Sequence, residues 1–238
     1  MAADLLAPLR EAPERSALVF DVDGTVAPIA PRPELAAVPA DMRRELERLA
    51  DRYRLLAFVT GRPGADAAAL VRVPGARYVG NHGLELDAEA AALAPKIAAF
   101  RDSVALPVED KGLTLSYHFR GAEDEAEARA ALDQVAAQAR AEGLVARWGR
   151  KVLEIRPDVA ADKGSAVERL ARESGVSRVL YAGDDATDID AFERLGGAQL
   201  DHVVRVAVIS DEVPVGLVSA ADLVVAGPKE LLMLLARL

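Results

Sequence analysis

One short stretch decides how this chain is interpreted, Leu18-Val-Phe-Asp-Val-Asp-Gly-Thr-Val26. The apolar run at its start is typical of a short buried strand, and Asp21 and Asp23 follow where that strand must end. Gly24 lets the chain turn away, and Thr25 adds a hydroxyl beside the carboxylates. Ligands of a parallel sheet bind at the carboxyl ends of its strands, but Asp and Gly are also ordinary turn residues. Polar residues further along the chain distinguish between a ligand site and an ordinary turn.

Composition narrows the class of protein. The 238 residues are 51% hydrophobic, contain no cysteine and carry a formal net charge of −9. No window reaches the ~18 apolar residues of a membrane span, and charges come too early for a signal peptide. Without cysteine, disulfides and thiolate metal sites are excluded, so we expect a cytoplasmic protein. The negative charge argues against nucleic acid as a partner, and an anionic substrate needs a local positive pocket.

The hydrophobic pattern alternates between strands and helices in two parts of the chain. Strands are predicted at 17–20, 54–59, 77–80, 178–182, 203–209 and 222–225. Helices are predicted at 40–52, 63–71, 162–174, in a segment ending near 195, and from 228 onward. This rhythm predicts a Rossmann-like parallel sheet with helices on both faces.

The segment between these two parts has a different pattern. Apolar and polar residues alternate over 113–120 and 151–156, which is typical of antiparallel strands with one covered face. Helices are predicted at 88–105 and 123–142, and further strands at 108–111 and 144–148. We therefore interpret 87–157 as a smaller α+β domain inserted into a core domain formed by 1–86 and 158–238.

Polar clusters follow the predicted strands or begin the predicted helices of the core. They are Asp21/Asp23, Thr60-Gly61-Arg62, Lys163 and Asp184/Asp185/Asp188. In a parallel sheet these clusters converge on one edge. So many carboxylates repel one another unless a cation is present, and oxygen ligands suit Mg²⁺, which shares its shell with waters and a phosphate. Helix capping explains a single aspartate at a helix start, but not four within seven residues, Asp184, Asp185, Asp188 and Asp190.

The remaining clusters carry positive charge or N–H groups. Lys163 lies in the first turn of its helix, where a cation opposes the macrodipole, so we expect it to neutralise Asp21 or a bound phosphate. The alternative is a solvated surface lysine. Thr60 and the Gly61 amide form an anion cradle at a helix start. Arg62 either contacts a phosphate or sugar or is merely solvated.

These parts are sufficient for phosphoryl transfer. An aspartate can attack phosphorus and form an aspartyl-phosphate, which divides hydrolysis into two easier displacements. Asp21 supplies the nucleophile, and Asp23 can protonate the leaving oxygen and later deprotonate water. Mg²⁺, Thr60 and Lys163 hold the developing charge.

The motif order Asp21-Val-Asp-Gly-Thr25, Thr60, Lys163 and Gly183-Asp-Asp-Ala-Thr-Asp188 resembles the haloacid dehalogenase superfamily of phosphotransferases. The inserted segment follows the second motif, like the cap of the subgroup that acts on sugar phosphates. Within that subgroup the chain is similar to the trehalose-6-phosphate phosphatases. The matching motifs are Thr60-Gly-Arg62, Asn81-His-Gly-Leu-Glu85, Glu109-Asp-Lys-Gly-Leu-Thr-Leu-Ser-Tyr-His-Phe-Arg120, Leu153-Glu-Ile-Arg-Pro157 and Asp184-Asp-Ala-Thr-Asp188.

This resemblance implies a Mg²⁺-dependent hydrolase that releases trehalose and phosphate from trehalose 6-phosphate in trehalose biosynthesis. It implies that the catalytic residues are Asp21, Asp23, Thr60 and Lys163. It implies that the metal is held by Asp21, the Asp23 carbonyl, Asp184 and Asp188, with Asp185 supporting. It implies that the substrate contacts Thr60, Gly61, Arg62 and His82 on the core and Glu109, Lys111 and Glu154 on the cap. We expect a monomer whose partner is a small-molecule sugar phosphate, with no membrane partner.

Other functions fit the same residues. A phosphatase for sucrose phosphate or glycosylglycerate phosphate would share the fold and the chemistry. A phosphomutase matches the cap motifs less well. A catalytically inactive phosphosugar sensor would share the fold without turnover, although intact Asp21 and Asp23 speak against it.

Overall fold

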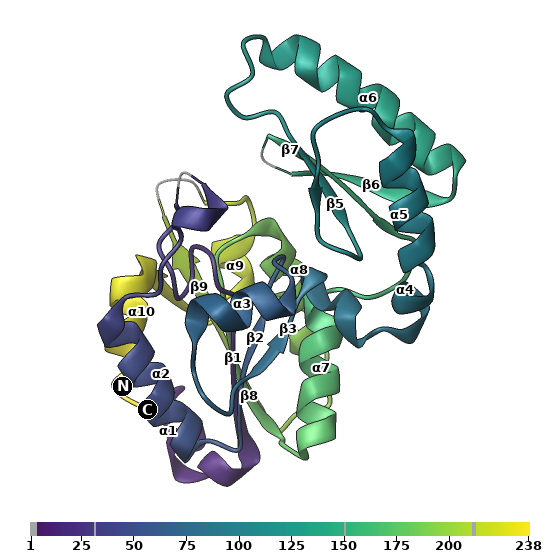
Figure 1. Ribbon diagram of the computed structural model, residues 1–238. Coiled ribbons are helices and arrows are strands. Elements are labelled where there is room, and N and C mark those ends of the chain that lie inside the picture. The colour runs from purple at the N-terminus through teal and green to yellow at the C-terminus, as the bar shows by residue number, and fades with distance from the viewer. Residues whose placement is uncertain (1–3, 31, 150, 211–212) are drawn as a thin grey trace. The chain divides into compact units, whose positions relative to one another are not determined.

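The computed structural model describes residues 4–30, 32–149, 151–210 and 213–238 (Figure 1). The chain divides into two compact units, which we call unit 1 (residues 1–83 and 161–238) and unit 2 (84–160). The expected insertion, 87–157, lies inside unit 2. Over the described residues, no helix has both the length and the apolar character to cross a bilayer.

A sheet of parallel strands runs through unit 1. Over the described residues its six strands are β1 (Ser16–Phe20), β2 (Leu55–Val59), β3 (Arg77–Val79), β8 (Arg178–Gly183), β9 (His202–Ile209) and β10 (Leu223–Ala226). They are ordered β10-β9-β8-β1-β2-β3, so β1 pairs with β2 on one side and β8 on the other. The strand order reverses between β1 and β8, and open parallel sheets bind ligands at such a switch point.

Helices cover both faces of this sheet (Figure 1). They are α1 (Ala7–Glu11), α2 (Ala40–Arg52), α3 (Gly64–Val71), α7 (Lys163–Ser174), α8 (Ala186–Gly196), α9 (Leu217–Ala220) and α10 (Gly227–Leu235). Short 3₁₀ turns occupy Pro13–Arg15 and Pro33–Leu35, and the segment Asn81–Leu86 contains 3₁₀ turns interrupted by a kink at His82 and Gly83. Leu18 and Phe20 join an apolar cluster with Leu46 of α2 and Leu231 of α10. Every residue of β1 is buried, which explains why its sequence is continuously apolar rather than alternating.

Unit 2 contains an antiparallel sheet, ordered β4-β5-β7-β6 over the residues described. Its elements are α4 (Ala88–Ala92), α5 (Ala94–Ser103), β4 (Glu109–Asp110), β5 (Leu115–His118), α6 (Glu125–Ala141), β6 (Leu144–Gly149) and β7 (Val152–Pro157). Leu115 and Tyr117 lie opposite Ile155 and Leu153 and pack with apolar residues of α5 and α6. The predicted architecture, a Rossmann-like parallel core with a smaller α+β part, is confirmed.

The prediction of a single helix over 88–105 is wrong. The structure has α4 and α5 there, separated at Leu93. Pro95 lacks the N–H that a continuous helix would donate to the carbonyl of Ala91, so it breaks the helix. The same proline is suited to the first turn of α5, because that turn needs no such donor.

Candidate active site

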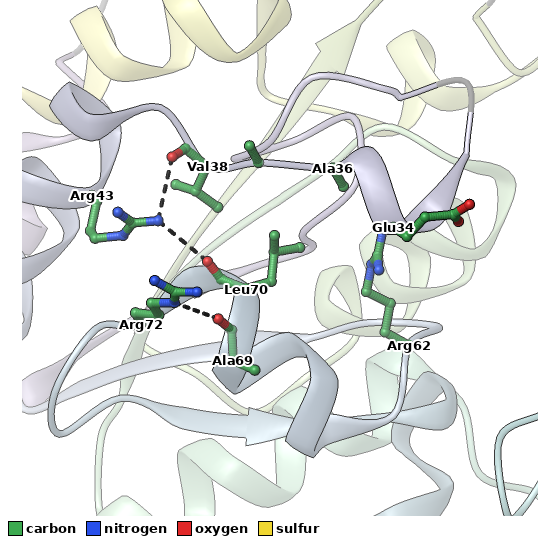
Figure 2. Close-up of a pocket in the computed structure, with 9 residues that line it drawn as sticks. Glu34, Ala36, Val38, Arg43, Arg62, Ala69, Leu70 and Arg72 are labelled. Atoms are coloured by element: carbon green, nitrogen blue, oxygen red, sulfur yellow. Dashed lines mark hydrogen bonds between the residues drawn. The ribbon is translucent and has the colours of Figure 1, made fainter.

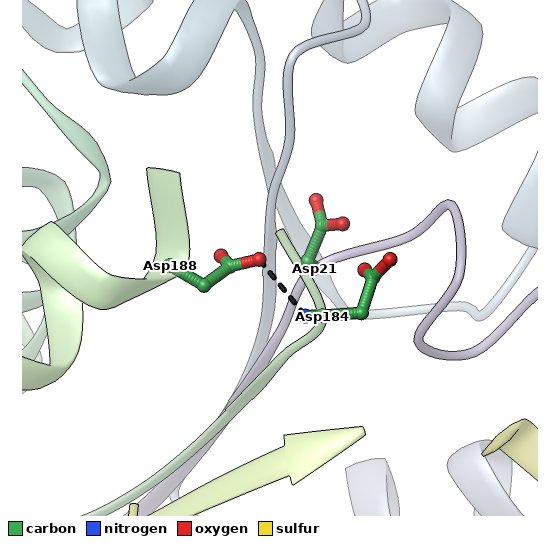
Figure 3. Close-up of side chains that lie close together, drawn as sticks. All are labelled: Asp21, Asp184 and Asp188. Carbon is green, nitrogen blue, oxygen red and sulfur yellow. Dashed lines mark hydrogen bonds between the residues drawn. The ribbon is translucent and has the colours of Figure 1, made fainter. Parts of the chain in front are cut away.

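The carboxyl ends of β1 and β8 bring two predicted acidic motifs together. Asp21 directly follows β1, Asp184 directly follows β8, and these two strands are neighbours. Carboxylate oxygens of Asp21, Asp184 and Asp188 lie within 4.8 Å of one another (Figure 3). Asp21 and Asp188 are buried and Asp184 is half-buried. Thr25 also reaches this cluster, since its hydroxyl donates to Asp184 Oδ1 at 3.0 Å.

A buried lysine lies beside the three carboxylates. Lys163 Nζ is 3.1 Å from Asp21 Oδ1 and 2.8 Å from Asp188 Oδ1, with only 2% of the side chain exposed. Asp162 caps α7 in front of it: its carboxylate accepts from Ser165 N, and the Ser165 hydroxyl accepts from Asp162 N. This capping box fixes the first turn of the helix and thereby the position of Lys163. The alternative of a solvated surface lysine is wrong.

Burial strongly shifts the pKa values of the residues in the acidic cluster. Burial raises the pKa of Asp21 to about 7, although Lys163 opposes this shift. Burial, followed by the charges of Asp21 and Asp188, raises the pKa of Asp184 to about 9. Burial would lower the pKa of Lys163, but the attraction of Asp188 and Asp21 outweighs it and keeps the ammonium charged. Without a further cation the cluster therefore retains protons, and these all-oxygen donors fit Mg²⁺.

Asp188 occupies a special position within this cluster. Its Oδ1 accepts from Lys163 Nζ at 2.8 Å and from the Tyr181 hydroxyl at 2.6 Å. Its Oδ2 accepts from the main-chain N–H groups of Asp184 and Asp185 at 3.0 and 2.9 Å. Tyr181 was not among the predicted site residues. The sequence signal that could have identified it is a single hydroxyl-bearing ring among Val179, Leu180 and Ala182, two residues before Gly183.

Asp23 lies beside the cluster, and its carboxylate is held by Arg62. Arg62 Nε donates to Asp23 Oδ2 at 2.6 Å, and Arg62 Nη2 donates to Asp23 Oδ1 at 2.7 Å. We expected Asp23 to bind the metal through its main-chain carbonyl, and this ion pair of the side chain does not involve that carbonyl. Arg62 was expected to contact phosphate or sugar. In this structure it orients Asp23, the residue expected to act as general acid and then as general base.

The loop after β2 brings the remaining core candidates together. Thr60 is buried, and its hydroxyl accepts from Arg62 N at 3.3 Å. Asn81 N donates to Arg62 O at 2.9 Å, and His82 N donates to Thr60 O at 2.8 Å. A Cβ at Gly61 would overlap the imidazole of His82, so glycine is what allows the ring to approach. These contacts therefore connect the loop at 60–62 with the loop at 81–82, and the two loops together carry Thr60, Gly61, Arg62 and His82.

The cap candidates share one face of the unit 2 sheet. Glu109 lies opposite Ser116, and Ser116 lies opposite Glu154, so both glutamates project from the same side. Lys111 Nζ is 3.9 Å from Glu109 Oε2, and His118 Nε2 is 2.8 Å from the same oxygen. Burial raises the pKa of Glu154, and Lys111 is the first charge that opposes this shift.

A cavity of about 560 Å³ has Arg62 as one of its lining residues (Figure 2). Arg43 and Arg72 also line it, but both donate to carbonyls near the end of α3: Arg43 to Val71 O, and Arg72 to Ala69 O. Cations at a helix C-terminus satisfy its free carbonyls and oppose its dipole, which accounts for these two arginines. The acidic cluster contributes no residue to the described lining.

Comparison with known proteins agrees with this geometry. The profile of the trehalose-phosphatase family matches residues 19–98 and 101–222. A trehalose-phosphate phosphatase of Mycobacterium avium (strain 104) is 36% identical over 213 residues, which are 79% of this chain and 53% of that protein. This chain thus spans about half the length of the curated relatives it matches.

Solved structures agree in fold. A trehalose-6-phosphate phosphatase related protein superimposes with a TM-score of 0.73 at 22% identity, covering 93% of this chain and 96% of that one. A haloacid dehalogenase-like hydrolase from Bacteroides thetaiotaomicron superimposes with a TM-score of 0.60 at 16% identity, covering 93% and 98%. Since the family profile extends over most of the sequence and its motifs meet at the ends of β1, β2 and β8, the chain belongs to the trehalose-phosphatase family.

Proposed function

We propose that this chain is a Mg²⁺-dependent phosphatase that hydrolyses trehalose 6-phosphate through an aspartyl-phosphate on Asp21. The observation that carries the proposal is the buried cluster at the switch point of the sheet, where Asp21 lies between Lys163 and Asp184. A buried carboxylate beside a charged lysine and further oxygen ligands is equipped to attack phosphorus. The choice of substrate is supported by the names of two curated relatives, both trehalose-phosphate phosphatases.

The metal would be held by Asp21, Asp184 and the main-chain carbonyl of Asp23. When bound, Mg²⁺ supplies positive charge to the phosphoryl oxygens and relieves the repulsion between the carboxylates. Lys163 Nζ donates to Asp188 Oδ1 and forms an ion pair with Asp21 Oδ1 at 3.1 Å; since an ammonium group has three N–H donors, it can also donate to a phosphoryl oxygen. The Thr60 hydroxyl and the Gly61 amide would bind the remaining phosphoryl oxygens.

Asp23 would protonate the sugar oxygen as the phosphoryl group moves to Asp21, and would then deprotonate the water that attacks the aspartyl-phosphate. Both of its carboxylate oxygens accept from Arg62 in this structure. Each of these oxygens has a second lone pair for the proton, so Asp23 can act while Arg62 holds it, or Arg62 can transfer one N–H group to the substrate. A phosphate or sugar oxygen of the substrate is a suitable new acceptor for that N–H group.

The sugar would be recognised by the polar face of unit 2. Glu109, Lys111 and Glu154 offer charged acceptors and donors on one sheet face, which suits a ring of hydroxyl groups. Sucrose phosphate and glycosylglycerate phosphate present similar hydroxyl patterns and are the alternative substrates.

A phosphate-release assay over a panel of sugar phosphates with Mg²⁺ tests the proposal. We expect the highest kcat/KM for trehalose 6-phosphate, with sucrose phosphate, a glycosylglycerate phosphate and an aryl phosphate as comparisons. A higher kcat/KM for another sugar phosphate would identify that compound as the preferred substrate and would leave the proposed chemistry unchanged. Binding of sugar phosphates without release of phosphate would identify a sensor and refute the enzymatic proposal.

A further inference from the structure

The hydroxyl of Tyr181 lies at the centre of the candidate active site, but it has no role in the chemistry proposed above. The side chain is fully buried in β8, and its ring packs edge-on against Phe192 of α8, with centroids 5.8 Å apart. Burial and this contact hold the ring in position. Its hydroxyl donates to Asp188 Oδ1 at 2.6 Å, the same oxygen that accepts from Lys163.

The hydrogen bonds of Asp188 define what that carboxylate can do. A carboxylate offers about four lone-pair sites, and Asp188 uses them for Tyr181, Lys163 and two main-chain amides. A metal ion could bind Asp188 only by displacing one of these donors. The sequence-based assignment of Asp188 as a metal ligand is therefore the less favourable role, and holding Lys163 is the more favourable one.

We propose that Tyr181 is a positioning residue for phosphoryl transfer, acting through Asp188 on Lys163. This inference rests on the proposed phosphatase function. With the Tyr181 hydroxyl present, Oδ1 of Asp188 divides its accepting capacity between the phenol and the ammonium. Lys163 consequently stays within reach of Asp21, at 3.1 Å, as well as Asp188, at 2.8 Å. Without the hydroxyl, Asp188 attracts the ammonium more strongly and draws it away from Asp21 and the phosphoryl group.

Tyr181→Phe removes only this hydroxyl and keeps the ring that packs on Phe192, so the fold should persist. Tyr117→Phe is the matched control, because Tyr117 is equally buried, lies in unit 2, and its hydroxyl has no hydrogen-bond partner among the described residues. For an aryl phosphate with Mg²⁺, we expect Tyr181→Phe to lower kcat about tenfold while KM changes less than about threefold. Tyr117→Phe should match the wild type.

A double-mutant cycle distinguishes positioning from general damage. If Tyr181 acts through Lys163, Tyr181→Phe should change kcat less than about twofold once Lys163 has been replaced by Met. An equal tenfold loss in both backgrounds would overturn the proposal, as would wild-type kcat in the single variant.

Binding of Mn²⁺, followed by electron paramagnetic resonance, gives a readout independent of turnover. We expect the affinity of Tyr181→Phe for Mn²⁺ to stay within about threefold of the wild type, whereas Asp184→Asn weakens it strongly. A large change in Tyr181→Phe would show that the hydroxyl governs metal ligation instead. Wild-type activity on the aryl phosphate without activity on trehalose 6-phosphate would refute the proposed substrate and leave this test intact.

Discussion

Asp21 combines two properties that a surface aspartate does not have. It is almost completely buried, and its charge is balanced by Lys163 from a different part of the chain. Burial without that lysine would leave the carboxylate strongly protonated and a poor nucleophile. In the proposed mechanism, the positive charges of Lys163 and a bound metal therefore keep Asp21 ionised and able to attack phosphorus.

Replacing Asp21 with Asn should abolish turnover while preserving the fold. The amide keeps the volume of the side chain but cannot attack phosphorus, so kcat should fall by roughly a thousandfold or more. Phosphate release and a thermal melt of the same sample measure both effects. Asp190→Asn, which changes an exposed aspartate of α8, is the control and should retain activity. Substantial turnover by Asp21→Asn would exclude the aspartyl-phosphate route.

The raised pKa values of Asp21 and Asp184 predict how stability without metal depends on pH. In the folded chain these groups keep protons up to about pH 7 and about pH 9, whereas their ordinary value is 3.8. The folded state therefore binds more protons over this interval, and the free energy of unfolding should fall as the pH rises through it.

Thermal melts in a chelator at about pH 5 and about pH 8.5 measure this dependence. Asp184→Asn lacks one of the shifted groups, so its melting temperature should decline less than that of the wild type. Mg²⁺ displaces the protons, so it should stabilise the wild type more at the higher pH. A parallel decline of the two proteins would show that Asp184 does not carry the raised pKa.

The turn after β1 shows how an element depends on a single backbone position. Gly24 has a φ of +84°, and a Cβ there would overlap the carboxylate of Asp184. The turn consequently brings the backbone of the first motif against the side chain of the last one. Glycine is required here for space as well as for conformation.

Gly24→Ala should weaken activity and the response to Mg²⁺ by at least about tenfold, because the new methyl group displaces Asp184. Gly75→Ala is the matched control: Gly75 has a φ of +76°, but no atom lies within 4 Å of the added Cβ. Both variants bear the cost of about 1 kcal/mol for a side chain at positive φ. Mg²⁺ titrations of activity separate them, and equal responses would show that the Asp184 position is not critical.

At the scale of the whole molecule, the proposed function divides chemistry and sugar recognition between the two units. The acidic cluster belongs to unit 1, and Glu109, Lys111 and Glu154 belong to unit 2. In an enzyme with this division, a substitution in unit 2 should reduce specificity for a large substrate without reducing the chemistry itself. The reason is that binding energy from distant parts of the full substrate is used in its transition state.

Glu154→Ala should therefore lower kcat/KM for trehalose 6-phosphate by about a hundredfold and change hydrolysis of a small aryl phosphate less than about threefold. Asp133→Ala, at an exposed position of α6, controls for general effects on unit 2. Equal losses on both substrates would place Glu154 in folding or phosphate chemistry. Unchanged kcat/KM for both would remove Glu154 from substrate recognition.

Local patterns were sufficient for much of the fold. The continuous apolar run of β1 predicted a strand buried on both faces, and helical spacing predicted α2 at its observed bounds, Ala40–Arg52. Where local preferences compete, prediction was less accurate. An alanine-rich segment predicted one helix over 88–105, although Pro95 divides it into α4 and α5.

The sequence by itself determined the parallel core, the family and the positions of the acidic motifs, because strand patterning and short motifs are local properties of the chain. Only the tertiary structure decided what each polar group contacts. It paired Asp23 with Arg62, buried Lys163 between Asp21 and Asp188, and brought the Tyr181 hydroxyl onto Asp188. Hydrogen bonds and charge interactions depend on distance in space, so residues 7 to 142 positions apart become partners only after the sheet has formed.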